Sequence, residues 1–281
     1  MTFTKIKSHA KLNLALNITG KTSSLHKIKR NVAFVDLHDE ILIKKTKSQK
    51  HNISFKGKFS NNIGKNNTIH KLLKFLEKKE LLNNKKFHIK IDKKIPSKAG
   101  LGGGSMNAAS ILNFFVKKKI INISKKEVLE ISKLVGSDVP LGLNFTNSII
   151  TSKNEIKYFT NCKKIYTLIV KPNFGCSTKD IYLKVKKFQK PKFNRPKKIM
   201  FNLEYIRKLN NSLEPIALSR YPKLKIIKLF LESLSHSVFV RMTGSGSALV
   251  AYFQTKERCQ RAEKEFNKKY KNYWCISSKT I

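Results

Sequence analysis

A glycine-rich segment carries the strongest chemical signal in this chain. Four of the twelve glycines fall within positions 100–104. Glycine permits positive φ angles and lets the backbone approach a ligand closely. The spacing of these glycines differs from both G-x-x-x-x-G-K-[ST] and G-x-G-x-x-G, so neither a Walker-type nor a Rossmann-type loop is predicted. The full segment reads Lys94-Ile95-Pro96-Ser97-Lys98-Ala99-Gly100-Leu101-Gly102-Gly103-Gly104-Ser105-Met106.

The residues on either side of this segment indicate how it is held. Residues 87–92 alternate between apolar and polar types, which predicts a strand, and residues 107–115 have small and apolar residues at helical spacing. A helix that begins directly after a glycine loop presents free N–H groups and a partial positive charge, which together bind phosphate. A plain glycine turn is the alternative, but three consecutive glycines followed by a serine and a helix favour an anion site.

Two other places contain charged or polar side chains whose role the residue types leave open. Lys11 and Asn13 lie on one face of a predicted strand whose opposite face is apolar at positions 12, 14, 16 and 18. Side chains in such positions are most often only solvated. Asp138 follows a predicted helix and precedes a Val-Pro step that ends regular structure. An aspartate in a Gly-Ser-Asp turn most often makes a local hydrogen bond.

The segment Pro96–Ser105 resembles the phosphate loop of the GHMP small-molecule kinases. Four further segments resemble motifs of this family, in the family's order: Ala10–Leu14, Gly136–Pro140, Pro172–Tyr182 and Thr243–Ala248. The resemblance covers nearly the whole chain. It implies an α+β, two-domain GHMP kinase fold with the active site in the interdomain cleft. The strand-rich beginning and a βαβ-like second half place the domains at 1–160 and 161–281.

The resemblance also implies roles for particular residues. Asp138 would be the base that accepts the proton of a substrate hydroxyl, and Lys11 would be its electrostatic partner. Mg²⁺ would accompany ATP, with its protein ligands unassigned. Asn13, His26, Thr178 and Tyr182 would hold a small-molecule substrate that carries cytidine diphosphate. The ATP phosphates would be bound by Pro96, Ser97, Lys98, Ala99, Gly100, Leu101, Gly102, Gly103, Gly104, Ser105 and Met106.

The expected substrate is an alcohol of the non-mevalonate isoprenoid precursor pathway. Ala10–Asn13 and Gly136–Pro140 together are typical of the branch of the family that phosphorylates such an alcohol, whereas mevalonate and homoserine kinases do not usually carry both. Two residues depart from the pattern. Leu25 replaces an aromatic residue and offers no π-stacking, and Met106 replaces a second serine after the glycines. Another GHMP kinase is therefore the alternative.

The formal net charge of +42 raises a second class of hypothesis, a nucleic-acid-binding protein on an old kinase fold. Lysine dominates over arginine and is spread along the whole chain, whereas arginine is favoured for base readout. The abundance of lysine, asparagine and isoleucine also follows from an A+T-rich genome. We therefore expect attraction of phosphorylated substrates and, at most, non-specific, salt-sensitive binding to nucleic acid.

The remaining composition favours a cytoplasmic enzyme. Cys162, Cys176, Cys259 and Cys275 lack metal-ligand spacing and suit a reducing compartment. The apolar runs are too short to span a membrane. The oligomeric state is left open.

Several further elements are predicted from local patterns. Asn67 or Thr68 caps a helix that, by the resemblance, starts near the adenine pocket, and Ser124 with Glu127 forms a capping box. Ser177 or Thr178 caps another helix. We also expect a polar turn over 19–31, a strand, turn and strand over 34–43, an exposed loop over 183–200, and strands over 165–170, 238–242 and 249–253.

Overall fold

The computed structural model describes residues 2–23, 26–61, 63–64, 66–151, 155–190, 193 and 195–281. They form two compact units that interleave along the sequence. Unit 1 comprises the residues up to Ala10, Leu37–Ser97 and Gly102–Phe145, and unit 2 comprises Lys11–Asp36, Lys98–Leu101 and Thr146–Ile281. The position 160/161 falls inside unit 2, and the predicted division into 1–160 and 161–281 stays a prediction.

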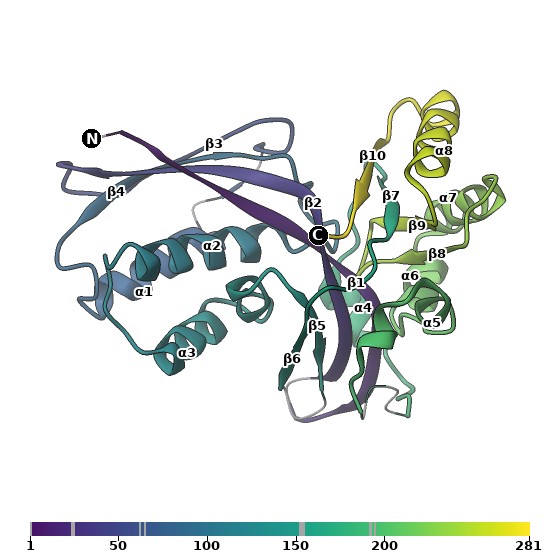
Figure 1. The fold of residues 1–281 in the computed structure, drawn as a ribbon, viewed down its shortest axis with the longest axis horizontal. Helices are drawn as coiled ribbons and strands as arrows, with labels where there is room; N and C mark the ends of the chain where they lie inside the picture. The colour runs from purple at the N-terminus through teal and green to yellow at the C-terminus, as the bar shows by residue number, and fades with distance from the viewer. Residues whose placement is uncertain are drawn as a thin grey trace. The chain divides into compact units, whose positions relative to one another are not determined.

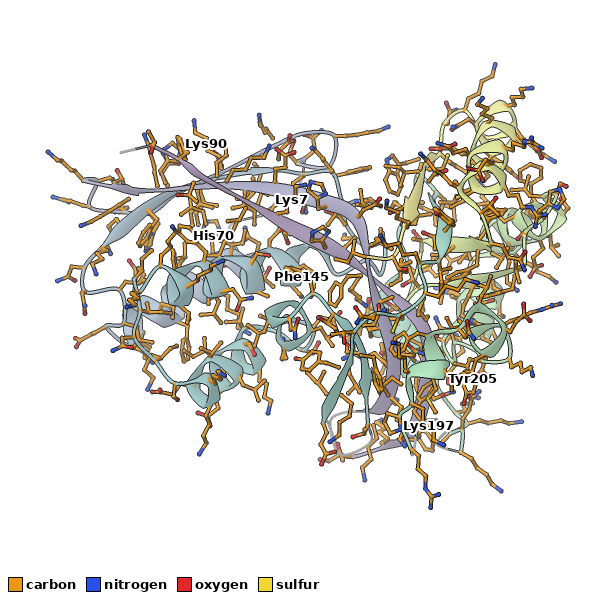
Figure 2. The ribbon with its side chains drawn as sticks, in the orientation of Figure 1. Lys7, His70, Lys90, Phe145, Lys197 and Tyr205 are labelled. Atoms are coloured by element: carbon orange, nitrogen blue, oxygen red, sulfur yellow. The ribbon has the colours of Figure 1, made fainter. Side chains whose placement is uncertain are left out.

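Unit 1 is a sheet with helices packed on one of its faces (Figure 1). Its β2 segment pairs antiparallel with β4, and β3 pairs parallel with β4. Along β4, the apolar side chains of Phe87, Ile89 and Ile91 are buried in the core shared with the helices, while Lys90 lies on the other face (Figure 2). The elements are β1 (Thr4–Lys21) and β2 (His26–Thr46), which contribute to both units, then β3 (Asn52–Lys56), α1 (Thr68–Lys78), β4 (Lys86–Asp92), α2 (Gly103–Lys117), α3 (Lys125–Val135) and η1 (Val139–Leu143).

The helix starts of unit 1 follow the predicted capping chemistry. The Asn67 side chain accepts hydrogen bonds from the backbone N–H groups of Ile69 and His70, at 3.0 and 3.2 Å. Ser124 and Glu127 form the predicted capping box of α3, in which each side chain accepts a hydrogen bond from the other residue's backbone N–H. These local contacts satisfy N–H groups that the first helical turn leaves unpaired. Both predictions are confirmed.

Unit 2 contains an antiparallel sheet in the order β10-β7-β9-β8, and β5 pairs antiparallel with both β2 and β6. The βαβ-like arrangement predicted for the second half is therefore wrong, because the paired strands of this sheet run antiparallel. Leu231, Phe253 and Phe266 are buried in the core between this sheet and its helices. The elements are β5 (Asn147–Ile150), β6 (Ile156–Phe159), β7 (Tyr166–Lys171), α4 (Thr178–Leu183), η2 (Lys198–Phe201), α5 (Leu203–Arg207), α6 (Glu214–Arg220), α7 (Pro222–Ser233), β8 (Phe239–Met242), β9 (Leu249–Phe253), α8 (Lys256–Lys269) and β10 (Trp274–Lys279).

The region 19–46 differs from the prediction. The predicted strand, turn and strand over 34–43 is a single strand, since β2 runs without interruption from His26 to Thr46. The segment contains neither glycine nor proline, and Asp39, which suggested a turn, is buried with hydrogen-bond partners. The predicted turn over 19–31 is shorter than expected, because β1 extends to Lys21.

Two further observations concern the predicted exposed loop and the length of the helices. The segment predicted as an exposed loop over 183–200 contains Phe193, whose side chain is fully buried. Within the part of the chain that the structure describes, no helix combines the length and the apolar character that crossing a bilayer requires.

Candidate active site

The glycine-rich segment forms the predicted loop between β4 and α2. Gly102 is the N-cap of α2 and has a φ of 71°, while Gly100 has a φ of 73° and Lys98 a φ of 52°. The left-handed conformation is strain-free for glycine, which explains two of the glycines in the motif. The side chains of Ser97 and Lys98 are exposed. The order strand, glycine loop and helix is confirmed, and it presents the first turn of α2 as a site for an anion.

In unit 1, the entry to the loop is fixed by Asp39, a residue that the sequence analysis did not select. One carboxylate oxygen of Asp39 accepts hydrogen bonds from the backbone N–H groups of Lys94 and Ile95, both at 2.8 Å. The other oxygen accepts from the Asn107 amide at 2.9 Å and pairs with the Lys93 ammonium. The available signal was the stretch Asp39-Glu40-Ile41, which resembles a D-x-[IL] pattern of the family.

In unit 2, the middle of the loop packs directly on the turn that follows β8. A Cβ atom at Gly100 would lie 2.1 Å from the carbonyl oxygen of Thr243, so only glycine fits at this position. The backbone N–H of Ser247 donates to the Lys98 carbonyl at 3.4 Å, and the Ala248 N–H donates to the Ala99 carbonyl at 3.3 Å. Two glycine-containing motifs that lie far apart in the sequence are thus in contact.

Lys11 and Asn13 belong to the same cluster in unit 2. Side chains on the polar face of a strand are most often solvated, but the exposed fractions here are only 3% for Lys11 and 1% for Asn13. The covering residues are the loop and the turn after β8: the Lys11 N–H donates to the Leu101 carbonyl at 3.0 Å, and the Asn13 N–H donates to the Thr243 hydroxyl at 2.9 Å.

The Asn13 side chain orients the ammonium of Lys11. With the amide oxygen assigned to the side that faces two donors, this oxygen accepts from the Lys11 Nζ at 2.5 Å and from the Gly244 N–H at 3.2 Å. This arrangement suits stabilisation of a transferring phosphoryl group.

In unit 1, Asp138 belongs to the segment that follows α3. Helix α3 ends at Val135, and Asp138 is the residue immediately before η1. A Cβ atom at Gly136 would lie 3.9 Å from the Ser105 hydroxyl and 3.9 Å from a methyl carbon of Thr68. Gly136, two residues before Asp138, therefore lies near the first turn of α2.

The side chain of Met106 is buried and faces η1. A Cβ atom at Gly142 would lie 3.0 Å from the Met106 sulfur, and the Met106 N–H already donates to the Gly102 carbonyl at 2.9 Å. The side chain and the backbone N–H of Met106 therefore both make contacts within unit 1. The replacement of a serine by Met106 removes a hydroxyl from the core of the unit, while the half-exposed Ser105 remains on the first turn.

The residues expected to hold the substrate base lie in unit 2. Tyr182 of α4 and His26 of β2 are in ring contact, with centroids 5.2 Å apart. Desolvation, and secondarily the charge of Lys21, lowers the pKa of His26 below its ordinary value. The Thr178 hydroxyl is 2.8 Å from the Ser245 hydroxyl, in the turn after β8. Ser177 caps α4 as predicted. Leu25 lies outside the described residues.

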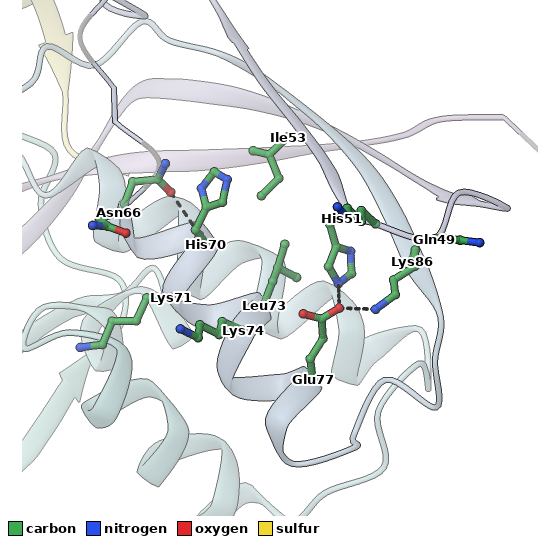
Figure 3. Close-up of a pocket in the computed structure, with 12 residues that line it drawn as sticks. Gln49, His51, Ile53, Asn66, His70, Lys71, Leu73, Lys74, Glu77 and Lys86 are labelled. Atoms are coloured by element: carbon green, nitrogen blue, oxygen red, sulfur yellow. Dashed lines mark hydrogen bonds and ion pairs between the residues drawn. The ribbon is translucent and has the colours of Figure 1, made fainter.

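A cavity of about 590 Å³ lies along α1 in unit 1 (Figure 3). Its apolar floor includes Ile53 and Leu73. Glu77 interacts with His51, at 3.2 Å, and with Lys86, and burial lowers the pKa of His51 despite this carboxylate. The cavity extends to Asn66 and Asn67 at the start of α1. There, the Thr68 hydroxyl donates to the Gly104 carbonyl at 2.7 Å, which joins the start of α1 to the glycine loop.

Within the described ranges, no cluster of three or more His, Cys, Asp or Glu side chains could hold a metal ion. Mg²⁺ typically uses few protein ligands and binds largely through water and substrate phosphates. The exposed start of α2, with the Ser105 hydroxyl beside Gly136, fits that mode of binding.

Comparisons with known proteins give the class first. Residues 67–144 match the GHMP kinases N terminal domain. The fold superposes on the crystal structure of a 4-(cytidine 5'-diphospho)-2C-methyl-D-erythritol kinase with a TM-score of 0.80 at 21% identity, covering 99% of this chain and 100% of the other. A homoserine kinase from Cytophaga hutchinsonii gives a TM-score of 0.71 at 16% identity, with coverage of 100% and 95%. The molecule therefore has the GHMP kinase fold, as predicted.

The sequence relatives are more specific. The chain is 55% identical over 277 residues to the 4-diphosphocytidyl-2-C-methyl-D-erythritol kinase of Pelagibacter ubique, covering 99% of each chain. The kinase of the same name from Petrotoga mobilis is 33% identical over 255 residues, which are 87% of this chain and 96% of the other. The chain belongs to the 4-diphosphocytidyl-2-C-methyl-D-erythritol kinase family.

Proposed function

We propose that this protein transfers the γ-phosphoryl group of ATP to a hydroxyl of 4-diphosphocytidyl-2-C-methyl-D-erythritol, in the non-mevalonate route to isoprenoid precursors. The observation that carries the proposal is the full-length identity of 55% to a kinase of that name. The cluster of Lys11, Asn13 and the glycine loop supports it independently of the identity, because its chemistry suits a transferring phosphate.

Lys11 and Asp138 are the proposed catalytic residues. Asp138 accepts the proton of the attacking hydroxyl, a role worth roughly 10²–10⁴-fold in rate for a general base. Lys11, oriented by Asn13, stabilises the negative charge on the transferring group. The contact of Gly136, two residues before Asp138, with the first turn of α2 supports its role, since that turn is the proposed anion site of unit 1.

The nucleotide is proposed to lie over the glycine loop. The backbone of residues 96–106 and the N-terminus of α2 hold its phosphates. Its adenosine lies at the Asn66–Asn67 end of the cavity along α1, which is joined to the loop through Thr68 and Gly104. Mg²⁺ bound with ATP would spread the charge of the phosphate oxygens, and the Ser105 hydroxyl is the protein group best placed to assist in holding it.

The cytidine diphosphate part of the acceptor is proposed to contact Asn13, His26, Thr178 and Tyr182. The aromatic ring of Tyr182 beside His26 supplies a surface on which a pyrimidine stacks. The contact of Thr178 with Ser245 connects this surface to the turn that packs on the glycine loop. Both observations lie within unit 2.

The first test is a coupled ADP-release assay with Mg-ATP, comparing 4-diphosphocytidyl-2-C-methyl-D-erythritol with mevalonate and homoserine. Turnover with the cytidine compound alone is the expected result. Turnover with another alcohol would agree with the GHMP kinase fold but would assign the protein a different substrate. Folded protein that binds ATP but phosphorylates none of the three would contradict the proposal and favour the nucleic-acid-binding alternative.

Asp138→Asn tests the proposed base. We expect kcat to fall by roughly 10³-fold, within the range for loss of a general base, while the dissociation constant for ATP changes little. The matched control is Glu130→Gln, which neutralises an exposed carboxylate on α3 of the same unit and should leave kcat unchanged. A near-normal kcat for Asp138→Asn would remove Asp138 from the role of base.

A further inference from the structure

Asp39 is a fully buried carboxylate in the middle of β2, and its partners sit on both sides of the glycine loop. Lys93, Lys94 and Ile95 form the entry to the loop, and Asn107 lies on α2, after the loop has ended. One oxygen of the carboxylate binds the entry backbone at 2.8 Å. The other binds the helix through Asn107 at 2.9 Å and pairs with Lys93. A single side chain thus connects the two ends of the loop.

The start of α2 also packs closely on the residues that Asp39 binds. A Cβ atom at Gly103, the first residue of α2, would lie 3.0 Å from a methyl carbon of Ile95 and 3.2 Å from the Lys93 Nζ. The helix start therefore rests directly on the residues that Asp39 holds. Ile95 precedes Pro96, which restricts its backbone to extended conformations. The direction in which the loop leaves β4 is fixed by the carboxylate on one side and by the proline on the other.

Asp39 and Lys93 form a buried ion pair. Lys93 has an exposed fraction of 4% and Asp39 of 0%, so both would carry a large desolvation cost if unpaired. Charge-assisted hydrogen bonds to an ionised carboxylate are short and strong. A neutral amide in the same place would leave the Lys93 ammonium buried without its partner.

We propose that Asp39 is a positioning residue of the phosphate loop: it sets the separation between the loop entry and the start of α2, and thereby the geometry in which nucleotide phosphates bind. The proposal rests on the proposed function only in that the loop binds ATP. Asp39 itself is buried and acts through Lys94, Ile95 and Asn107. Misplacement of a binding group by about 1 Å can cost 10²-fold in rate, so a small shift of this carboxylate has a measurable effect.

Asp39→Glu is the decisive variant, because it keeps the charge and moves the carboxylate by one methylene. We expect the dissociation constant for a non-hydrolysable ATP analogue with Mg²⁺, measured calorimetrically, to rise at least tenfold. The dissociation constant for CDP, a probe of the acceptor side, should stay within twofold of the wild-type value. Asp39→Asn combined with Lys93→Met removes the buried pair without leaving a lone charge and should give the same split between the two ligands.

Glu40→Gln is the matched control. Glu40 is the next residue of β2, and its carboxylate bonds to the ammonium groups of Lys5 and Lys94 at the surface. The control should bind both ligands as the wild type does. A merely structural role for Asp39 predicts that Asp39→Glu weakens ATP analogue and CDP in parallel as Tm falls; that result, or unchanged nucleotide binding, would overturn the proposal.

The readout separates this proposal from the proposed function. Wild-type protein that binds the ATP analogue but phosphorylates none of the tested alcohols would contradict the function, while the role of Asp39 would still be decided by the nucleotide dissociation constants. Wild-type protein that does not bind the analogue at all would overturn the positioning role, because the loop would then hold no nucleotide.

Discussion

At the scale of single residues, His26 has a protonation state that matters for its proposed contact with a cytosine ring. Its imidazole lies beside the Tyr182 ring, and desolvation together with Lys21 lowers its pKa below 6.5. The imidazole is therefore neutral at pH 7 and has one N–H donor and one acceptor nitrogen. A neutral ring is suited to hydrogen bonding with a cytosine edge.

The lowered pKa gives a prediction with a definite sign. The folded state resists protonation of His26. The contribution of the neutral imidazole to stability is therefore present above pH 6.5 and is lost as the pH falls through the lowered pKa of His26. We expect KM for the cytidine substrate to be constant above pH 7 and to rise below 6.5, and His26→Gln to remove this rise. His236→Asn, at an exposed histidine, is the control and should retain it. A rise that persists in His26→Gln would assign the titration to another group.

Lys11 and Asn13 show where sequence reasoning reached its limit. The alternation of apolar residues correctly placed both side chains on one face of β1, away from Leu12 and Leu14. It could not predict that this face is buried, because the covering residues come from positions near 100 and 243. Resemblance to a family motif, and not periodicity, was the signal that identified these residues.

At the scale of elements, η1 packs closely against α2 because Gly142 has no side chain. A Cβ atom there would lie 2.7 Å from the Ala109 Cβ and 3.0 Å from the Met106 sulfur. Asn113 on α2 also donates to the Leu143 carbonyl at 2.9 Å. Because Asp138 immediately precedes η1, the contact between η1 and α2 contributes to the placement of the proposed base.

Gly142→Ala should therefore impair both stability and turnover. Overpacking of a close contact typically costs about 1–3 kcal/mol, so we expect a lower free energy of unfolding by denaturant titration. We also expect a reduced kcat, because displacement of η1 moves Asp138. The control is Gly20→Ala, where a Cβ would make an ordinary contact with Lys27 at 3.6 Å. Loss of stability with an unchanged kcat would show that η1 does not position Asp138.

Elements defined by local chemistry were predicted well, and those defined by distant partners were not. The N-caps at Asn67 and Ser177 and the capping box at Ser124 depend on residues within one helical turn, so the sequence contains the whole signal. The continuity of β2 through Asp39 depends on Lys93 and Asn107, which lie more than fifty residues further along the chain. The polar residues from Asp36 to Glu40 therefore indicated a turn where the fold places a buried ion pair.

At the scale of the whole molecule, the net charge of +42 is the property that acts over the longest distance. Lysine and arginine number 59 against 17 acidic residues, so the acidic groups can neutralise only a minority of the positive charge. Membership of the kinase family makes nucleic-acid binding unnecessary as an explanation of the fold. The charge still acts on any polyanion that approaches, which includes ATP, a nucleoside diphosphate acceptor and nucleic acid.

This charge predicts how turnover depends on salt. Both proposed substrates are anionic, and a positive field raises their encounter rate, whereas chemistry within a bound complex is little affected by the field outside it. Because the Debye length shortens to about 10 Å at 0.1 M salt, we expect kcat/KM to fall several-fold between low and physiological ionic strength while kcat stays constant. Steady-state kinetics across a NaCl series measure this, with sucrose at equal osmolality as the control. A kcat/KM that is independent of salt would show that the lysines do not accelerate substrate capture. A parallel fall in kcat would mean that salt acts on the folded enzyme itself and not on the encounter.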